Sequence, residues 1–149
     1  MNLKQLLFTL AFVCGASVAT AQVKQVTIDG KTYYGTKAIP PELEGKYLYY
    51  KEKEPIVEIV KGGTGWFQVH DVPAYPVEFW IETDAKGNVQ KRKSETNNNY
   101  QVVLIVLYGD NQQPGWKGAN KNTYTRIEAT VAYDQGYVII LGERFKPIR

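Results

Sequence analysis

The chain has 149 residues, a formal net charge of +3 at pH 7, and a composition that is 22% charged, 44% hydrophobic and 13% aromatic. This length suits one domain, and so small a net charge by itself says little about partners. With one histidine and one cysteine, the chain also lacks the nitrogen and sulfur ligands from which zinc sites are usually built.

A secretory signal peptide is predicted at residues 1–21. Lys4 supplies a positive charge, an uncharged apolar run follows, and Ala19-Thr20-Ala21 has the small-x-small pattern at which leader peptidases cleave. The apolar run is shorter than the roughly 20 residues of a membrane-spanning helix, so no membrane span is expected after cleavage. The only cysteine, Cys14, leaves with the leader, which removes disulfides, a cysteine nucleophile and thiolate ligands. We therefore expect a secreted or periplasmic protein that begins at Gln22.

The first elements after the leader are a hairpin and a short helical turn. Residues 26–28 and 32–34 are β-prone and flank Asp29-Gly30, whose residues tolerate positive φ, so this spacing predicts a tight β-hairpin. The adjacent prolines 40–41 cannot lie in the centre of a strand. Residues 41–45 fit one helical turn that ends at a glycine.

Short strands are then predicted at regular spacing to the end of the chain. They cover residues 46–54, 56–60, 65–70, 77–83, 88–93, 100–110, 123–133 and 137–145. The run at 102–107 is apolar at every position, which indicates a strand buried on both sides or one whose outer face is covered. Outside the leader, no window of a dozen residues has sustained helical spacing of apolar residues.

These short strands predict a single all-β domain over residues 22–149. Turn signals between short strands are typical of antiparallel structures. We expect a single antiparallel barrel, and a β-sandwich is the alternative.

The chain from "PELEGKY" onward resembles the lipocalin-like (calycin) barrels. A turn leads into a first strand, hairpins follow, and a late strand carries Arg144. In that family the first strand begins with Gly-x-Trp, and the tryptophan packs under an arginine from a late strand. Gly45 and Tyr47 occupy these positions here, with tyrosine in place of tryptophan, and the family's middle Thr-Asp-Tyr motif has no counterpart. The resemblance implies a cup that holds a small apolar ligand.

Nucleophilic and metal chemistry are not expected. His70 is followed by Asp71, but neighbouring residues on a strand point to opposite faces, so the two do not pair simply. Ser94 is the only serine after the leader and lies in a polar loop region. A Ser-His-Asp triad is therefore not predicted, and neither is a metal site.

A pair of carboxylates is the remaining catalytic candidate. Glu78 and Glu82 are four residues apart on one strand and share a face with Trp80, an arrangement that a glycosidase could use. However, all three alternate with the apolar residues of 77–81, so the plain interpretation is a solvent face opposite a core face, with Trp80 exposed or half-exposed. We predict no catalytic residue, no cofactor and no enzyme activity.

The aromatic residues are the most distinctive feature of the chain. Eleven tyrosines and three tryptophans offer broad apolar contact with a polar tip, which suits a barrel lining, a sugar platform or a protein interface. The predicted ligand-binding residues lie at strand ends, in loops, or at the family's tryptophan position: Trp66, Tyr75, Trp80, Trp116 and Tyr47.

Two functions follow from these features. The first is an exported, non-enzymatic binding protein that holds a small apolar or amphipathic ligand in a β-barrel. The alternative is an interaction domain that binds another exported protein or a glycan through an aromatic sheet face. The basic segment 86–93 carries no aromatic residue and lies beside a turn, so no nucleic-acid partner is expected.

Overall fold

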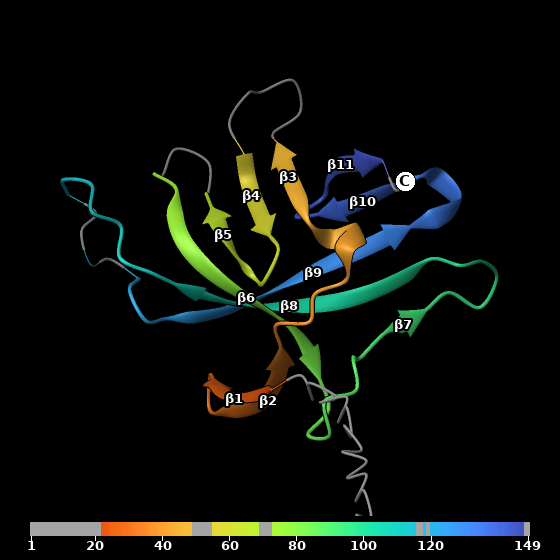
Figure 1. Cartoon of the computed structure of the whole chain (residues 1–149), viewed down its shortest axis with the longest axis horizontal. Coiled ribbons are helices and arrows are strands. Elements are labelled where there is room, and N and C mark those ends of the chain that lie inside the picture. The colour runs from red at the N-terminus through yellow and green to blue at the C-terminus, as the bar shows by residue number, and fades with distance from the viewer. Residues whose placement is uncertain (1–21, 49–54, 69–72, 116–117, 119, 148–149) are drawn as a thin grey trace, which may run out of the picture.

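A computed structural model describes residues 22–48, 55–68, 73–115, 118 and 120–147 (Figure 1). In these ranges the chain forms strands joined by loops and turns, and the only helical elements are two short 3-10 turns. The elements are β1 (Val23–Ile28), β2 (Lys31–Thr36), η1 (Pro41–Leu43), β3 (Gly45–Leu48), β4 (Pro55–Val60), β5 (Thr64–Phe67), β6 (Tyr75–Thr83), β7 (Arg92–Lys93), β8 (Tyr100–Tyr108), β9 (Tyr124–Ala132), η2 (Tyr133–Gln135), β10 (Tyr137–Ile140) and β11 (Glu143–Pro147).

The sheet curves into a nearly closed antiparallel barrel. Its strands follow the order β11-β10-β9-β8-β6-β5-β4-β3, and the two strands at the ends of this order, β11 and β3, lie side by side. Closure of this kind removes the free edges of a sheet. The predicted all-β barrel is confirmed, and the sandwich alternative is set aside.

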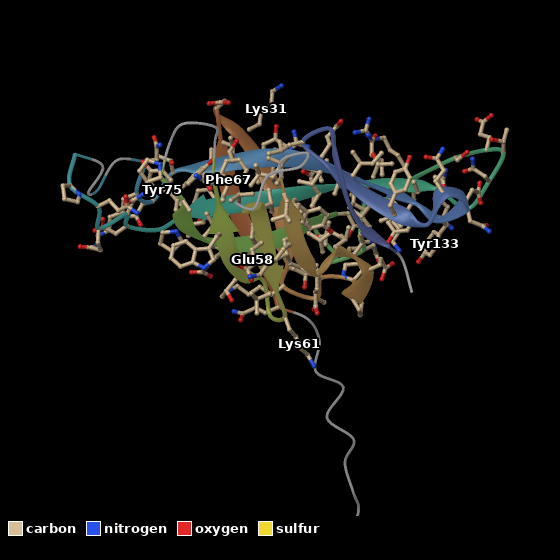
Figure 2. All side chains as sticks on the ribbon, turned by 90° about the horizontal axis from the view of Figure 1, so that it is seen from above. Lys31, Glu58, Lys61, Phe67, Tyr75 and Tyr133 are labelled. Carbon is tan, nitrogen blue, oxygen red and sulfur yellow. The ribbon has the colours of Figure 1, made fainter. Side chains whose placement is uncertain are left out.

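The barrel has two different ends. Because neighbouring strands are antiparallel, β3, β5 and β8 finish at the same end at which β4, β6 and β9 begin; we call this the loop end. The other end carries η1, the turn at residues 61–63 and η2. Tyr75 marks the loop end in Figure 2, and Tyr133 lies far across the molecule.

Side chains that point inward form one contiguous core. They alternate along β6 (Val77, Phe79, Ile81) and β8 (Val102, Leu104, Val106), and each is at most 5% exposed, which confirms the predicted core face. At the η1 end, Leu43 packs into this core, and the Tyr47 hydroxyl donates a hydrogen bond of 2.8 Å to the Leu43 carbonyl. Burial raises the pKa of Tyr47.

The β1–β2 hairpin covers part of the barrel's outer face. Asp29 and Gly30 have φ of 49° and 73° at its turn, as predicted, and β2 pairs with the far end of β6. Under it, Val26, Trp80 and Ile105 form a second buried cluster. β8 is therefore covered on its outer side, as its apolar run indicated.

Burial of Trp80 corrects the expectation that this side chain is exposed. It is only 4% exposed, because the hairpin backbone approaches closely at Gly35, where a Cβ would lie 2.8 Å from the Trp80 Cβ. The period-2 pattern marks Trp80 as facing outward, but it does not indicate that another strand pair covers that face.

Two strand boundaries also differ from the prediction. The return strand expected at 137–145 is split into β10 and β11 by Leu141-Gly142, whose φ values of 51° and 80° make a turn. Within 88–93, Val89 forms only an isolated bridge, and Arg92–Lys93 pairs with β8 instead of extending the hairpin from β6.

Among the residues described, no helix has the length and apolar character needed to cross a membrane. The predicted leader lies outside them.

Candidate functional site

The structure disperses the predicted ligand-binding residues. Tyr47 has no exposed surface and is a core residue, and Tyr75 is 2% exposed on the inner face at the loop end. Trp66 lies on the outer face of β5 and is 46% exposed. Trp80 lies under the β1–β2 hairpin. Trp116, together with His70 and Asp71, falls outside the described residues.

The described interior is tightly filled. Tyr47, Phe79, Ile81, Leu104 and Val106 each have no exposed surface, so no space large enough for a water molecule touches them. Phe67 and Tyr75, which Figure 2 shows on the same side of the molecule, extend this packing to the loop end.

Two buried hydroxyls, those of Tyr75 and Thr83, have no hydrogen-bond partner among the described residues. The Tyr108 ring contacts the rings of Phe67 and Tyr75 edge-on, at centroid distances of 5.5 and 5.6 Å, and burial raises the pKa of Tyr108. The Tyr75 hydroxyl is buried without a hydrogen-bond partner, which is unusual for a buried polar group. Nearby, Asn111 is 2% exposed and donates a hydrogen bond of 3.0 Å from its side chain to the Ala74 carbonyl.

A groove of about 700 Å³ lies outside the barrel wall, between β6 and the start and end of the hairpin. We call it the Trp80 groove. Its volume is within the range of pockets that hold small molecules. Its lining combines apolar, hydroxyl and charged side chains: Gln22, Val23, Lys24, Thr36, Lys37, Ala38, Glu78 and Trp80.

Two lysines surround the indole of Trp80. The Lys24 Nζ lies 4.1 Å from the centre of the Trp80 ring and 5.4 Å from that of Tyr124, and the Lys37 Nζ lies 5.1 Å from the Trp80 ring. Lys37 also forms an ion pair with Glu78. No carboxylate within ion-pair distance of Lys24 is found in the described part of the chain. Among the described residues, the charged end of Lys24 therefore contacts aromatic faces and no carboxylate.

A smaller hollow of about 250 Å³ meets the Trp80 groove at Glu78. It runs toward the loop end between β6 and β8 and is lined by Pro76, Val77, Glu78, Leu107, Tyr108, Gly109 and Asn122. Together the two hollows follow the outer face of β6 from the hairpin to the loop end.

Glu78 and Glu82, the carboxylate pair that the sequence offers for catalysis, have different partners. Glu78 pairs with Lys37, whereas Glu82 accepts two hydrogen bonds from Arg126, at 2.8 and 3.0 Å. The guanidinium of Arg126 also lies over the Tyr33 ring, 4.2 Å from its centre. Only Glu78 lines the Trp80 groove, so the two carboxylates do not face one reacting centre.

No group of three or more His, Cys, Asp or Glu side chains that could hold a metal ion occurs within the described ranges.

Trp66 belongs to a separate, more exposed surface. In register it lies between Glu58 on β4 and Pro76 on β6. Glu58 pairs with Lys46 at 3.5 Å. Trp66 is the largest aromatic side chain that the described surface presents to solvent.

Sequence reasoning found Trp80 but missed Lys24, Lys37 and Tyr124, which contact it. These residues lie far from Trp80 in the chain, and no motif or spacing connects them. One signal was available in the sequence. Trp80 is predicted to point outward beside a strand that is apolar on both faces, and such an outer face has to be covered by another segment of the chain.

No family model, curated protein or solved structure matches this chain. The function is therefore argued from the geometry alone.

Proposed function

We propose that this chain is a non-enzymatic binding protein that takes a small amphipathic ligand in the Trp80 groove. The observation that carries the proposal is the groove itself, about 700 Å³ in volume, in which apolar walls and charged groups meet. Ligand pockets generally combine apolar lining with a few polar groups that orient the ligand.

Binding would rest on burial of apolar ligand surface against Val23, Ala38 and the small exposed part of Trp80. Such burial contributes about 25 cal/mol per Å². The groove is favoured over the barrel interior because the described interior side chains already fill their space. With the leader predicted at residues 1–21, this binding would take place outside the cytoplasm.

Native mass spectrometry of protein purified from cells that make it naturally tests this proposal. Ala38 is exposed and lines the groove, so Ala38→Trp fills the groove without changing the core. We expect a ligand-sized additional mass on the wild type and its loss in Ala38→Trp. Thr32→Trp, an exposed position on the same hairpin outside the groove, should retain it. A bare protein mass in the wild type, or a ligand unaffected by Ala38→Trp, would refute the proposal.

A second candidate function rests on Trp66. Its exposed ring lies in register with Pro76 on one side and Glu58 on the other. Trp66 and Pro76 therefore offer neighbouring apolar side chains. A flat exposed aromatic ring suits a glycan or a protein partner. Affinity electrophoresis through polysaccharide gels would detect glycan binding. Retardation that disappears in Trp66→Ala and persists in Ala38→Trp would support this candidate, and unretarded wild type would oppose a glycan partner.

A further inference from the structure

The charges that line the Trp80 groove do not balance. Lys24, Lys37 and Glu78 are its charged side chains. Glu78 is paired with Lys37, which leaves the ammonium of Lys24 over the aromatic faces of Trp80 and Tyr124. The ring faces contact one side of this ammonium, so a charge-assisted hydrogen bond to an anion can be added on its other side.

The two ammonium groups are close enough to act on one ligand. Both lie within 5.1 Å of the centre of the same indole ring, so they are at most about 10 Å apart by that geometry. An acid group that pairs with Lys24 in the groove is therefore also within the field of Lys37.

Thr36 adds a buried hydroxyl to the same wall. It is 2% exposed and lines the groove. Its Oγ1 accepts a hydrogen bond of 3.2 Å from the Ala38 amide, and its own proton has no acceptor in the part of the chain that the structure describes. A hydroxyl whose proton is unused is a donor for an acceptor-rich ligand group.

The apolar part of the groove adjoins these donors. Val23 and Ala38 line the groove together with Trp80. A ligand that follows this surface meets cations and a hydroxyl donor at one place and hydrocarbon or aromatic side chains beside it. This arrangement matches a molecule with an acid group joined to an apolar body.

We infer that the Trp80 groove is specific for anionic amphiphiles, with the acid group held by Lys24 and Thr36 and the apolar body against Val23, Ala38 and Trp80. The inference rests on the proposed function and names its ligand class. A cationic ligand is disfavoured because it would have to replace the Lys24 ammonium on the ring faces. A neutral amphiphile would leave the ammonium and the Thr36 proton without an anionic acceptor.

Two fluorescent probes that share an aromatic skeleton separate charge from apolar contact. 1-Anilinonaphthalene-8-sulfonate carries an acid group, and N-phenyl-1-naphthylamine does not. In fluorescence titrations we expect the wild type to bind the sulfonate at least about tenfold more tightly than the neutral probe. Raising the salt concentration should weaken the binding of the sulfonate probe and not that of the neutral probe, because salt screens the charge of the sulfonate.

Variants of one side chain identify the cation. Lys24→Met should reduce sulfonate affinity about tenfold or more and leave the neutral probe unchanged, whereas Lys24→Arg should retain most sulfonate binding. Lys31→Met is the matched control, since Lys31 is exposed on the same hairpin and lies outside the groove lining. Loss of apparent affinity for both probes in Lys24→Met would indicate a damaged groove and overturn the assigned role of Lys24.

The outcomes distinguish this inference from the proposed function. Equal affinity for both probes, abolished by Ala38→Trp, would overturn the anion specificity and leave a binding groove. Sulfonate affinity that is the same in Lys24→Met as in the wild type would also overturn it. Binding of neither probe, or binding that Ala38→Trp does not change, would count against the groove itself.

Discussion

The two faces of β6 differ although they belong to one strand of nine residues. Val77, Phe79 and Ile81 point inward and contribute to a core with almost no exposed surface. Glu78, Trp80 and Glu82 point outward, where the carboxylates are ion-paired and the indole lies under a hairpin and two lysines. The inner face contributes stability through close packing, whereas the outer face leaves a groove. Substitutions on the inner face should therefore change mainly stability, and substitutions on the outer face should change mainly the groove.

The largest effect is expected on the inner face. Phe79→Ala removes a ring with no exposed surface and should lower the free energy of unfolding by about 3–5 kcal/mol, because it loses burial and leaves a cavity. Urea unfolding followed by circular dichroism measures this change. On the outer face, Glu78→Gln should shift the same free energy by less than about 1 kcal/mol, as for other exposed ion pairs. A similar loss in both variants would remove the distinction between the faces.

Gly35 tests how closely the hairpin is attached to the outer face. Its missing side chain allows β2 to approach Trp80, and Gly35→Val would place a Cβ 2.8 Å from the Trp80 Cβ. Overpacking of this kind costs about 1–3 kcal/mol. We expect Gly35→Val to red-shift tryptophan emission, because the hairpin is displaced, and to weaken probe binding in the groove. Normal emission and binding would mean that the hairpin contributes nothing to the site. Lys31→Ala, at the far end of β2, serves as the control.

Two tyrosines of the inner face form a matched pair. The Tyr47 hydroxyl donates to the Leu43 carbonyl, whereas the buried Tyr75 hydroxyl has no hydrogen-bond partner in the part of the chain that the structure describes. Tyr47→Phe should therefore cost about 1 kcal/mol of unfolding free energy, since a buried acceptor loses its donor. Tyr75→Phe should be neutral or slightly stabilising, since it removes a buried polar group that lacks a hydrogen bond. Denaturant curves of both variants decide this, and a clear loss of stability in Tyr75→Phe would show that its hydroxyl is bonded in solution.

The smallest effect is expected at the η1 end, at Glu42. Burial raises the pKa of Glu42, but a hydrogen bond donated by Tyr100 at 2.6 Å, one from the backbone of Glu42 itself, one from Tyr133 at 3.2 Å and the charge of Lys91 together outweigh burial, so the pKa lies below the ordinary value. A carboxyl whose folded-state pKa is lowered contributes stability above its unfolded-state pKa and loses it as the pH falls through the folded-state pKa. The midpoint temperature of thermal unfolding should thus fall less steeply between pH 6 and pH 3 in Glu42→Gln than in the wild type. Parallel curves for the two proteins would contradict this account.

Much of the fold is local in origin and could be predicted. Asp29-Gly30 favours a tight hairpin because both residues adopt positive φ. The alternation of Val77, Phe79 and Ile81 with polar neighbours assigned the core face of β6 correctly. The uninterrupted apolar run at 102–107 indicated that β8 would be covered on both sides.

The candidate site was far less predictable. Trp80, predicted as a ligand-binding residue, is one of the residues that line the groove, but Lys24 and Lys37, which supply the positive charge there, carry no local signal. Tyr47 was selected for its position in a family pattern, and the structure gives it a hydrogen bond inside the core. Side-chain type indicates what a residue can bind, whereas access to a ligand depends on which strands cover it.

The sequence by itself determined the all-β class, the hairpin at Asp29-Gly30 and the inward face of β6, because these depend on backbone preferences and on the two-residue period of a strand. Only the tertiary structure decided that β2 pairs with the end of β6, that the hairpin covers Trp80, and that Lys24 lies over its ring. Those contacts join residues far apart in the chain. Their free energy depends on how whole surfaces pack, which no local pattern of residues records.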